Sequence, residues 1–121
     1  MKIYREFTFE AAHRLTRVPR DHKCARLHGH SFRCQVEVEG PVGDDTGWVI
    51  DFADIKEAFE PLRQLLDHNY LNEIEGLSNP TSENLARWIW RKLKPSLPIM
   101  KRVLVSETCN SGCIYEGEDE R

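Results

Sequence analysis

Two stretches of the chain alternate between apolar and polar residues, which is the pattern of a β-strand with one buried face. In residues 2–14 the apolar face ends at His13. In residues 28–39 the apolar face consists of His28, His30, Phe32, Cys34, Val36 and Val38. The alternation predicts two half-buried strands, with imidazoles at the end of one apolar face and at the start of the other.

Apolar residues at helical spacing predict two helices in the middle of the chain. The first is expected to follow the cap residue Asp51 and to be kinked or interrupted at Pro61, because proline lacks the N–H that a helix needs. The second is expected to start at Thr81 or Ser82, whose hydroxyls can cap a helix, and to stop before Pro95.

Two more strands are expected after the helices, at residues 102–108 and around residues 113–117. The element order ββααββ predicts an α+β fold, with two helices on one face of an antiparallel four-stranded sheet. The chain has no repeats or low-complexity linkers. We therefore expect residues 1–121 to form a single domain, in which residues 116–121 are a flexible acidic tail.

The histidines of the two long strands predict a metal site. If these strands pair antiparallel, His13 meets His28 and His30, unless a bulge at Gly29 breaks the alignment. Three neutral imidazoles suit zinc and leave a fourth position open for chemistry. The alternative for each histidine is a hydrogen-bonded core residue, but three that converge favour a metal.

A reactive thiol lies in the loop between the same two strands. Cys24 is surrounded by cations that favour the thiolate. From the residues alone it is equally a fourth zinc ligand, a catalytic base or nucleophile, or a loop thiol without chemistry. The segment from Arg14 to Arg26, here called the basic loop, is either an attractor for an anionic substrate or a solvated loop. Its charged residues are Arg14, Arg17, Arg20, Asp21, Lys23 and Arg26.

Acidic side chains suggest two further functional positions. Asp67 and His68 follow the first helix and offer a titrating imidazole beside a carboxylate, although a histidine there can simply stabilise the last helical turn. Glu107 shares the apolar face of its strand with Val103 and Val105. A carboxylate in that position must be paired, either in a buried salt bridge or with a ligand rich in N–H groups.

Composition narrows the class of function. The chain is 40% hydrophobic and 31% charged, as in an ordinary globular protein. A net charge of −3 argues against a general nucleic-acid binder, and no apolar run approaches the ~20 residues of a membrane span. We expect no nucleic-acid or membrane partner, a cytoplasmic location and reduced cysteines. The cysteines assigned to packing or turns are Cys34, Cys109 and Cys113.

Six segments, in order and over nearly the whole chain, resemble the 6-pyruvoyltetrahydropterin synthase family. They are FTFEAAHRL, CARLHGHSF, TGWVIDFADIK, LDHNYLN, NPTSENLARWIW and SETCNSGC. Three residues separate Cys24 from His-Gly-His, a spacing similar to that of the bacterial branch that makes 6-carboxytetrahydropterin for queuosine biosynthesis. The biopterin branch typically has five residues in that gap, and a folate-linked branch has glutamate in place of the cysteine.

The resemblance implies the tunnelling fold, in which subunits join their sheets into a barrel, commonly as trimers paired into hexamers. It implies Zn²⁺ held by His13, His28 and His30. It also implies that Cys24 is the catalytic base, beside the metal rather than bound to it.

The resemblance further implies that Asp67 and His68 are an acid–base pair that reaches the site of a neighbouring subunit. Glu107 would anchor the pterin ring of 7,8-dihydroneopterin triphosphate, and the products would be 6-carboxytetrahydropterin, acetaldehyde and triphosphate. The alternative within the family is 6-pyruvoyltetrahydropterin. Outside it, the residues also fit a three-histidine zinc hydrolase or lyase, or a non-enzymatic module whose zinc site Cys24 closes.

Overall fold

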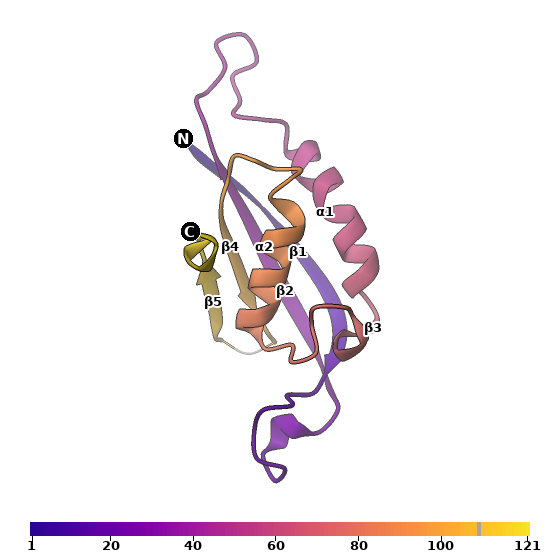
Figure 1. Ribbon diagram of the computed structural model, residues 1–121. Coiled ribbons are helices and arrows are strands. Elements are labelled where there is room, and N and C mark those ends of the chain that lie inside the picture. Colours follow the sequence, from indigo (N-terminus) through magenta and orange to yellow (C-terminus); the bar gives the residue numbers. More distant parts are fainter. Residues whose placement is uncertain (109) are drawn as a thin grey trace.

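A single mixed sheet forms one layer of the molecule, and two helices cover one of its faces (Figure 1). The computed structural model describes residues 1–108 and 110–121, so Cys109 lies outside the described residues. The strands are β1 (Lys2–His13), β2 (His28–Glu39), β3 (Asn69–Tyr70), β4 (Met100–Ser106) and β5 (Gly112–Tyr115). The helices are α1 (Phe52–Leu66) and α2 (Ser82–Leu93). Short 3-10 turns occupy Lys23–Ala25, Leu71–Glu73 and Glu118–Glu120.

The sheet has five strands in the order β3-β1-β2-β4-β5, so the predicted four-stranded antiparallel sheet is wrong in one respect. The extra strand, β3, pairs parallel to β1 at Ala11 and Ala12. It is two residues long, which is too short to produce an alternating pattern in the sequence. The α+β class and the two helices are confirmed.

The alternation along the two long strands is confirmed by their burial. Phe9 and Ala11 on β1, and Phe32, Cys34 and Val36 on β2, are buried in the core. Gly29 pairs with Ala12 without a shift in register. A register shift does occur on β2, but between Glu37 and Val38, where the strand pairs with β4. The histidine end of the β1–β2 ladder is therefore regular.

Both helices begin at the predicted caps. The Asp51 side chain accepts a hydrogen bond from the Ala53 N–H at 2.9 Å, and the Thr81 hydroxyl accepts one from the Asn84 N–H at 3.1 Å. Of the kink or interruption predicted at Pro61, an interruption is wrong, because α1 continues through Pro61 to Leu66, while a kink stays a prediction. Pro61 lies on the exposed face of α1, where water can bond the carbonyl that loses its N–H partner.

The acidic C-terminal residues lie against α2. Asp119 and Glu120 pair with Arg87 and Arg91 at 2.6 and 2.9 Å, and Tyr115 donates its hydroxyl to Glu120 at 2.5 Å. These contacts hold residues 118–120 in a 3-10 turn, while the flexibility expected of residues 116–121 stays a prediction. Among the described residues, every helix is too short or too polar to cross a bilayer.

Candidate functional site

Three histidines meet at the end of the β1–β2 ladder, as the antiparallel pairing requires. His13 lies directly opposite His28, and Ala11 lies opposite His30. One ring nitrogen from each histidine lies within 4.8 Å of those of the other two, so the three can hold a metal ion. The ring centroids are 4.6 to 5.1 Å apart. We call His13, His28 and His30 the histidine trio.

Backbone carbonyls fix the orientation of two of these rings. His13 Nδ1 lies 2.8 Å from the Pro80 carbonyl oxygen, and His28 Nδ1 lies 2.7 Å from that of Arg26. A carbonyl only accepts, so each Nδ1 carries the proton and each Nε2 keeps its lone pair. Carbonyls that hold the far nitrogen in this way are the usual second layer around a metal-binding histidine.

The environment of His13 fits a metal in particular. Only 1% of the residue is exposed, and its Nε2 is buried with no hydrogen-bond partner among the described residues. Burial lowers the pKa of His13, which keeps the imidazole neutral, and only a neutral imidazole can donate its lone pair to a metal. An unpartnered buried nitrogen beside two more imidazoles is the donor set that zinc prefers.

Cys24 lies in the middle of the 3-10 turn Lys23–Ala25, part-buried, and carries a free thiol. Its backbone is fixed on both sides: Leu15 donates its N–H to the Cys24 carbonyl at 2.7 Å, and Cys24 donates its own N–H to His22 Nδ1 at 3.0 Å. Its sulfur is not a member of the metal-binding group formed by the histidine trio. That geometry gives no support to a fourth zinc ligand.

Glu107 lies just past β4 and faces the histidine trio. One carboxylate oxygen lies 3.3 Å from His30 Nε2, and the other accepts the Ser82 hydroxyl at 3.0 Å. Ser82 opens α2, so the start of that helix and the end of β4 meet here. The sequence singled out Ser82 only as a cap; its link to Glu107 depends on how α2 docks on the sheet.

Asp67 and His68 contact each other, with Asp67 Oδ1 3.1 Å from His68 Nδ1. The Glu10 N–H donates to the same carboxylate, and this bond, with His68 and Arg63, lowers the pKa of Asp67. His68 has a φ of 58°, unusual for a residue with a side chain, and its side chain is 78% exposed. His68 is not a member of the metal-binding group formed by the histidine trio, although it lines one hollow together with His30.

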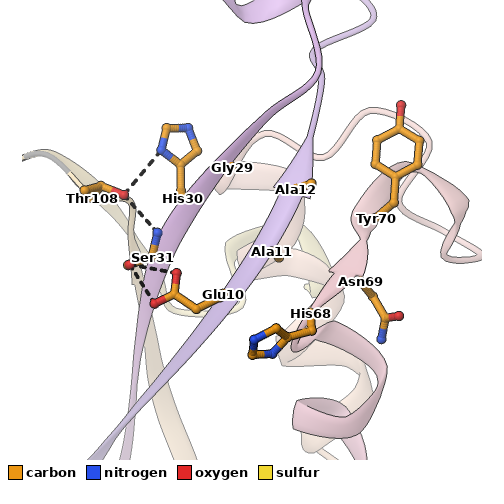
Figure 2. A pocket seen from close by; sticks show the side chains of 10 residues that line it. All are labelled: Glu10, Ala11, Ala12, Gly29, His30, Ser31, His68, Asn69, Tyr70 and Thr108. Carbon is orange, nitrogen blue, oxygen red and sulfur yellow. Dashed lines mark hydrogen bonds between the residues drawn. The ribbon is translucent and has the colours of Figure 1, made fainter.

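Figure 2 shows this hollow, which His30 and His68 line together with residues of β1, β2 and β3. Ser31 donates its hydroxyl to both oxygens of Glu10 at 2.7 Å, and its N–H donates to the Thr108 hydroxyl oxygen at 2.9 Å. That hydroxyl lies 3.4 Å from His30 Nδ1, so Thr108 completes the outer contacts of the histidine trio. Sequence reasoning missed Thr108 and Pro80, and no pattern marks either residue.

Comparisons with known proteins agree on one family. The family model described as 6-pyruvoyl tetrahydropterin synthase matches residues 2–118. The 6-carboxy-5,6,7,8-tetrahydropterin synthase of Synechocystis is 47% identical over 93% of this chain and 91% of that protein. The human 6-pyruvoyl tetrahydrobiopterin synthase is 32% identical over 97% of this chain and 92% of its own length.

The fold agrees as well. The solved 6-pyruvoyl tetrahydropterin synthase of Caenorhabditis elegans superposes with a TM-score of 0.90 at 28% identity, covering 98% of this chain and 96% of that one. Sequence match and fold cover nearly all of the chain, including the histidine trio, Glu107 and the Asp67–His68 pair. This chain belongs to the 6-pyruvoyl tetrahydropterin synthase family.

Proposed function

We propose that this chain is a zinc-dependent 6-carboxy-5,6,7,8-tetrahydropterin synthase. It would convert 7,8-dihydroneopterin triphosphate and one water molecule, which is consumed in the carbon–carbon cleavage, to 6-carboxytetrahydropterin, acetaldehyde and triphosphate, in queuosine biosynthesis. The observation that carries the proposal is the histidine trio with the unpartnered Nε2 of His13, in a chain 47% identical to the Synechocystis protein of that name. The gap of three residues between Cys24 and His-Gly-His supports the carboxy product rather than the pyruvoyl one.

The metal would be held by His13, His28 and His30. A bound zinc ion supplies a Lewis acid that makes nearby hydroxyl and C–H protons easier to remove. The carbonyls of Pro80 and Arg26 hold two of these imidazoles in orientation before any ligand arrives.

Glu107 would bind the substrate ring. An ionised carboxylate can accept two parallel hydrogen bonds from the N–H groups of an amino-pyrimidinone edge. The Ser82 hydroxyl donates to one of its oxygens, which limits the rotation of the carboxylate and supports this role.

Proton transfer would be divided between two groups. Cys24, as the thiolate, removes a proton from the substrate side chain, and His68, oriented by Asp67, relays protons. The reducing equivalents pass from the side chain to the ring of the same molecule, so no redox cofactor is needed.

Assembly is part of the proposal, because we infer that His68 serves the site of a neighbouring subunit. Two sheet edges are open in the described residues: β1 has β3 beside it only at Ala11 and Ala12, and β5 pairs only with β4. Open edges invite pairing with another chain. A homo-oligomer built from trimers would close these edges and bring an exposed His68 against a second subunit.

Product identification tests the proposal. Purified, zinc-loaded protein is incubated with 7,8-dihydroneopterin triphosphate, the pterins are separated by chromatography, and released aldehyde is trapped. We expect a carboxylated tetrahydropterin and acetaldehyde in equal amounts. A pyruvoyl pterin without acetaldehyde would instead assign the activity named for the human relative. No turnover of any pterin would contradict both.

A further inference from the structure

The cations of the basic loop differ from most other arginines of the molecule. Among the described residues, five of the seven arginines elsewhere pair with carboxylates within 4.0 Å: Arg33, Arg63, Arg87, Arg91 and Arg102. The other two, Arg5 and Arg121, have no ion pair among these residues, but they lie apart in the chain and do not form a cluster. None of the described ion pairs involves a cation of the basic loop, and all five cations of the loop are exposed. The loop contains one acid, Asp21, against five cations. Its positive charge is therefore not neutralised within the chain.

The basic loop is also held in a defined shape at its base. Arg14 exchanges two hydrogen bonds with the Asn72 side chain, at 3.0 and 2.9 Å. The Thr16 N–H donates to the Asn79 side chain at 3.1 Å, and the Leu15 N–H closes the loop onto the Cys24 carbonyl. These hydrogen bonds come from asparagine side chains and backbone amides, which are neutral, so the cations of the loop are left without ion pairs in the described part of the chain. Figure 1 shows the loop extending past the end of the sheet, beyond both helices.

Three of the five cations lie next to residues of the site along the chain. Arg14 follows His13, and Lys23 precedes Cys24. The Arg26 carbonyl accepts the bond from His28 Nδ1, which fixes the backbone of Arg26 beside the histidine trio. Arg17 and Arg20 lie further out, and the His22 N–H bond to the Pro19 carbonyl makes a turn around Arg20.

We propose that the basic loop is the triphosphate-binding site for the substrate of the proposed function. Arg14, Lys23 and Arg26 contact the phosphate oxygens at the base of the loop, and Arg17 and Arg20 attract the anion from the tip. Arginine forks and lysine ammonium groups are the usual partners of phosphate, and unpaired cations lose no ion pair when they bind it. The inference rests on the proposed function for the identity of the anion but needs no turnover to be tested.

The test uses inorganic triphosphate as the probe, with calorimetry on zinc-loaded protein at two salt concentrations. Lys23→Gln with Arg26→Gln should weaken binding at least about tenfold, because each removes a hydrogen bond to a charged group. Binding to the unaltered chain should weaken as salt rises, since exposed charges are screened. The matched control is Lys56→Gln with Lys101→Gln, which removes two exposed cations from α1 and β4 and should leave the affinity unchanged.

Two results would overturn the inference: equal affinity in the loop variant and the unaltered chain, or an equal loss in the control. Zinc content is measured in every sample, so that damage to the histidine trio is not mistaken for loss of the anion site. The KM for 7,8-dihydroneopterin triphosphate separates the two proposals. Triphosphate binding without pterin turnover would refute only the proposed function, whereas normal turnover with an unchanged KM in the loop variant would refute only the inference.

Discussion

His13 shows at the scale of a residue how the fold prepares a site. Its Nδ1 donates a hydrogen bond to the Pro80 carbonyl, and its Nε2 is buried without a hydrogen-bond partner among the described residues. A buried polar atom without a hydrogen bond destabilises a protein by about 1–3 kcal/mol. A metal bound at this nitrogen would offset that penalty.

Replacing His13 with alanine should therefore abolish metal binding at the histidine trio. We expect zinc affinity to fall by more than about 100-fold, beyond the loss seen when only an outer contact is removed. The measurement is zinc content after dialysis, together with competition against a chelator. The control is His68→Asn, which removes a histidine outside the trio and keeps a residue that tolerates a positive φ. Retention of full zinc affinity by the His13 variant would exclude the trio as the metal site.

Cys24→Ala should keep stoichiometric zinc and lose turnover, because the thiol is proposed as a base and not as a ligand. Zinc content and product formation are measured on the same preparation. Loss of zinc in this variant would make Cys24 a ligand, and full activity would make it a loop thiol without chemistry.

Glu107→Gln should raise the KM for the pterin about 10- to 100-fold, because it removes a charge-assisted acceptor from the ring N–H groups. Zinc content should not change, since Glu107 is proposed to hold substrate rather than metal. Ser82→Ala offers a milder comparison, because it removes only the hydroxyl that orients the carboxylate. Unchanged kinetics in the Glu107 variant would remove its anchoring role.

At the scale of an element, the segment from the end of α1 to β3 organises the Asp67–His68 pair. Arg63 lies one helical turn before Asp67 and donates to it at 3.3 Å, while the Glu10 N–H of β1 binds the other oxygen. His68 takes the left-handed conformation, and its N–H bonds the Glu10 carbonyl at 2.5 Å. The pair is thus fixed by a helix end and a strand edge together.

The lowered pKa of Asp67 predicts a pH-dependent contribution to stability. A carboxyl with a lowered folded pKa stabilises the protein above its unfolded pKa, and that contribution is lost as the pH falls through the folded pKa. Asp67→Asn should lower the urea midpoint at pH 7, and the difference from the unaltered chain should shrink below about pH 4. Asp45→Asn, in an exposed loop, is the control and should show little difference at either pH. A pH-independent difference for Asp67→Asn would contradict this account.

Elements with a clear period could be predicted from the sequence, and contacts between distant elements could not. The strands β1 and β2 follow from alternation, and their antiparallel pairing brings His13 to His28. The strand β3 follows directly after the backbone of His68 and, among the described strands, pairs only with β1. Neither feature produces a pattern of apolar and polar residues from which the strand could be predicted. Pro80 is 67 positions from His13 in the chain, so its contact depends on how the start of α2 docks.

At the scale of the whole molecule, the proposed function places the exposed His68 at the site of a neighbouring subunit. This can be tested by complementation. Cys24→Ala and His68→Asn subunits should each be inactive alone. Dissociated, mixed and reassembled, they should regain roughly a quarter of the activity, because some sites then receive an intact Cys24 and an intact neighbouring His68.

Light scattering on the same mixtures checks that assembly occurs, and mass should be a multiple of the 14.1 kDa chain. Reassembled particles without recovered activity would place Cys24 and His68 in one subunit's site. A protein that is monomeric at all concentrations would refute the shared site altogether.

The direct pairing of His13 with His28 has a consequence for how such a protein can evolve. The sheet ladder fixes the separation of these two residues, so insertions or deletions in residues 14–27 lengthen or shorten the hairpin without moving the ligands. An insertion between Phe9 and His13 would instead turn His13 to the other side of the sheet. Selection can therefore change the residues proposed to contact the substrate's anion and proton without changing the positions of the three histidines. New specificities are expected to arise in this hairpin first.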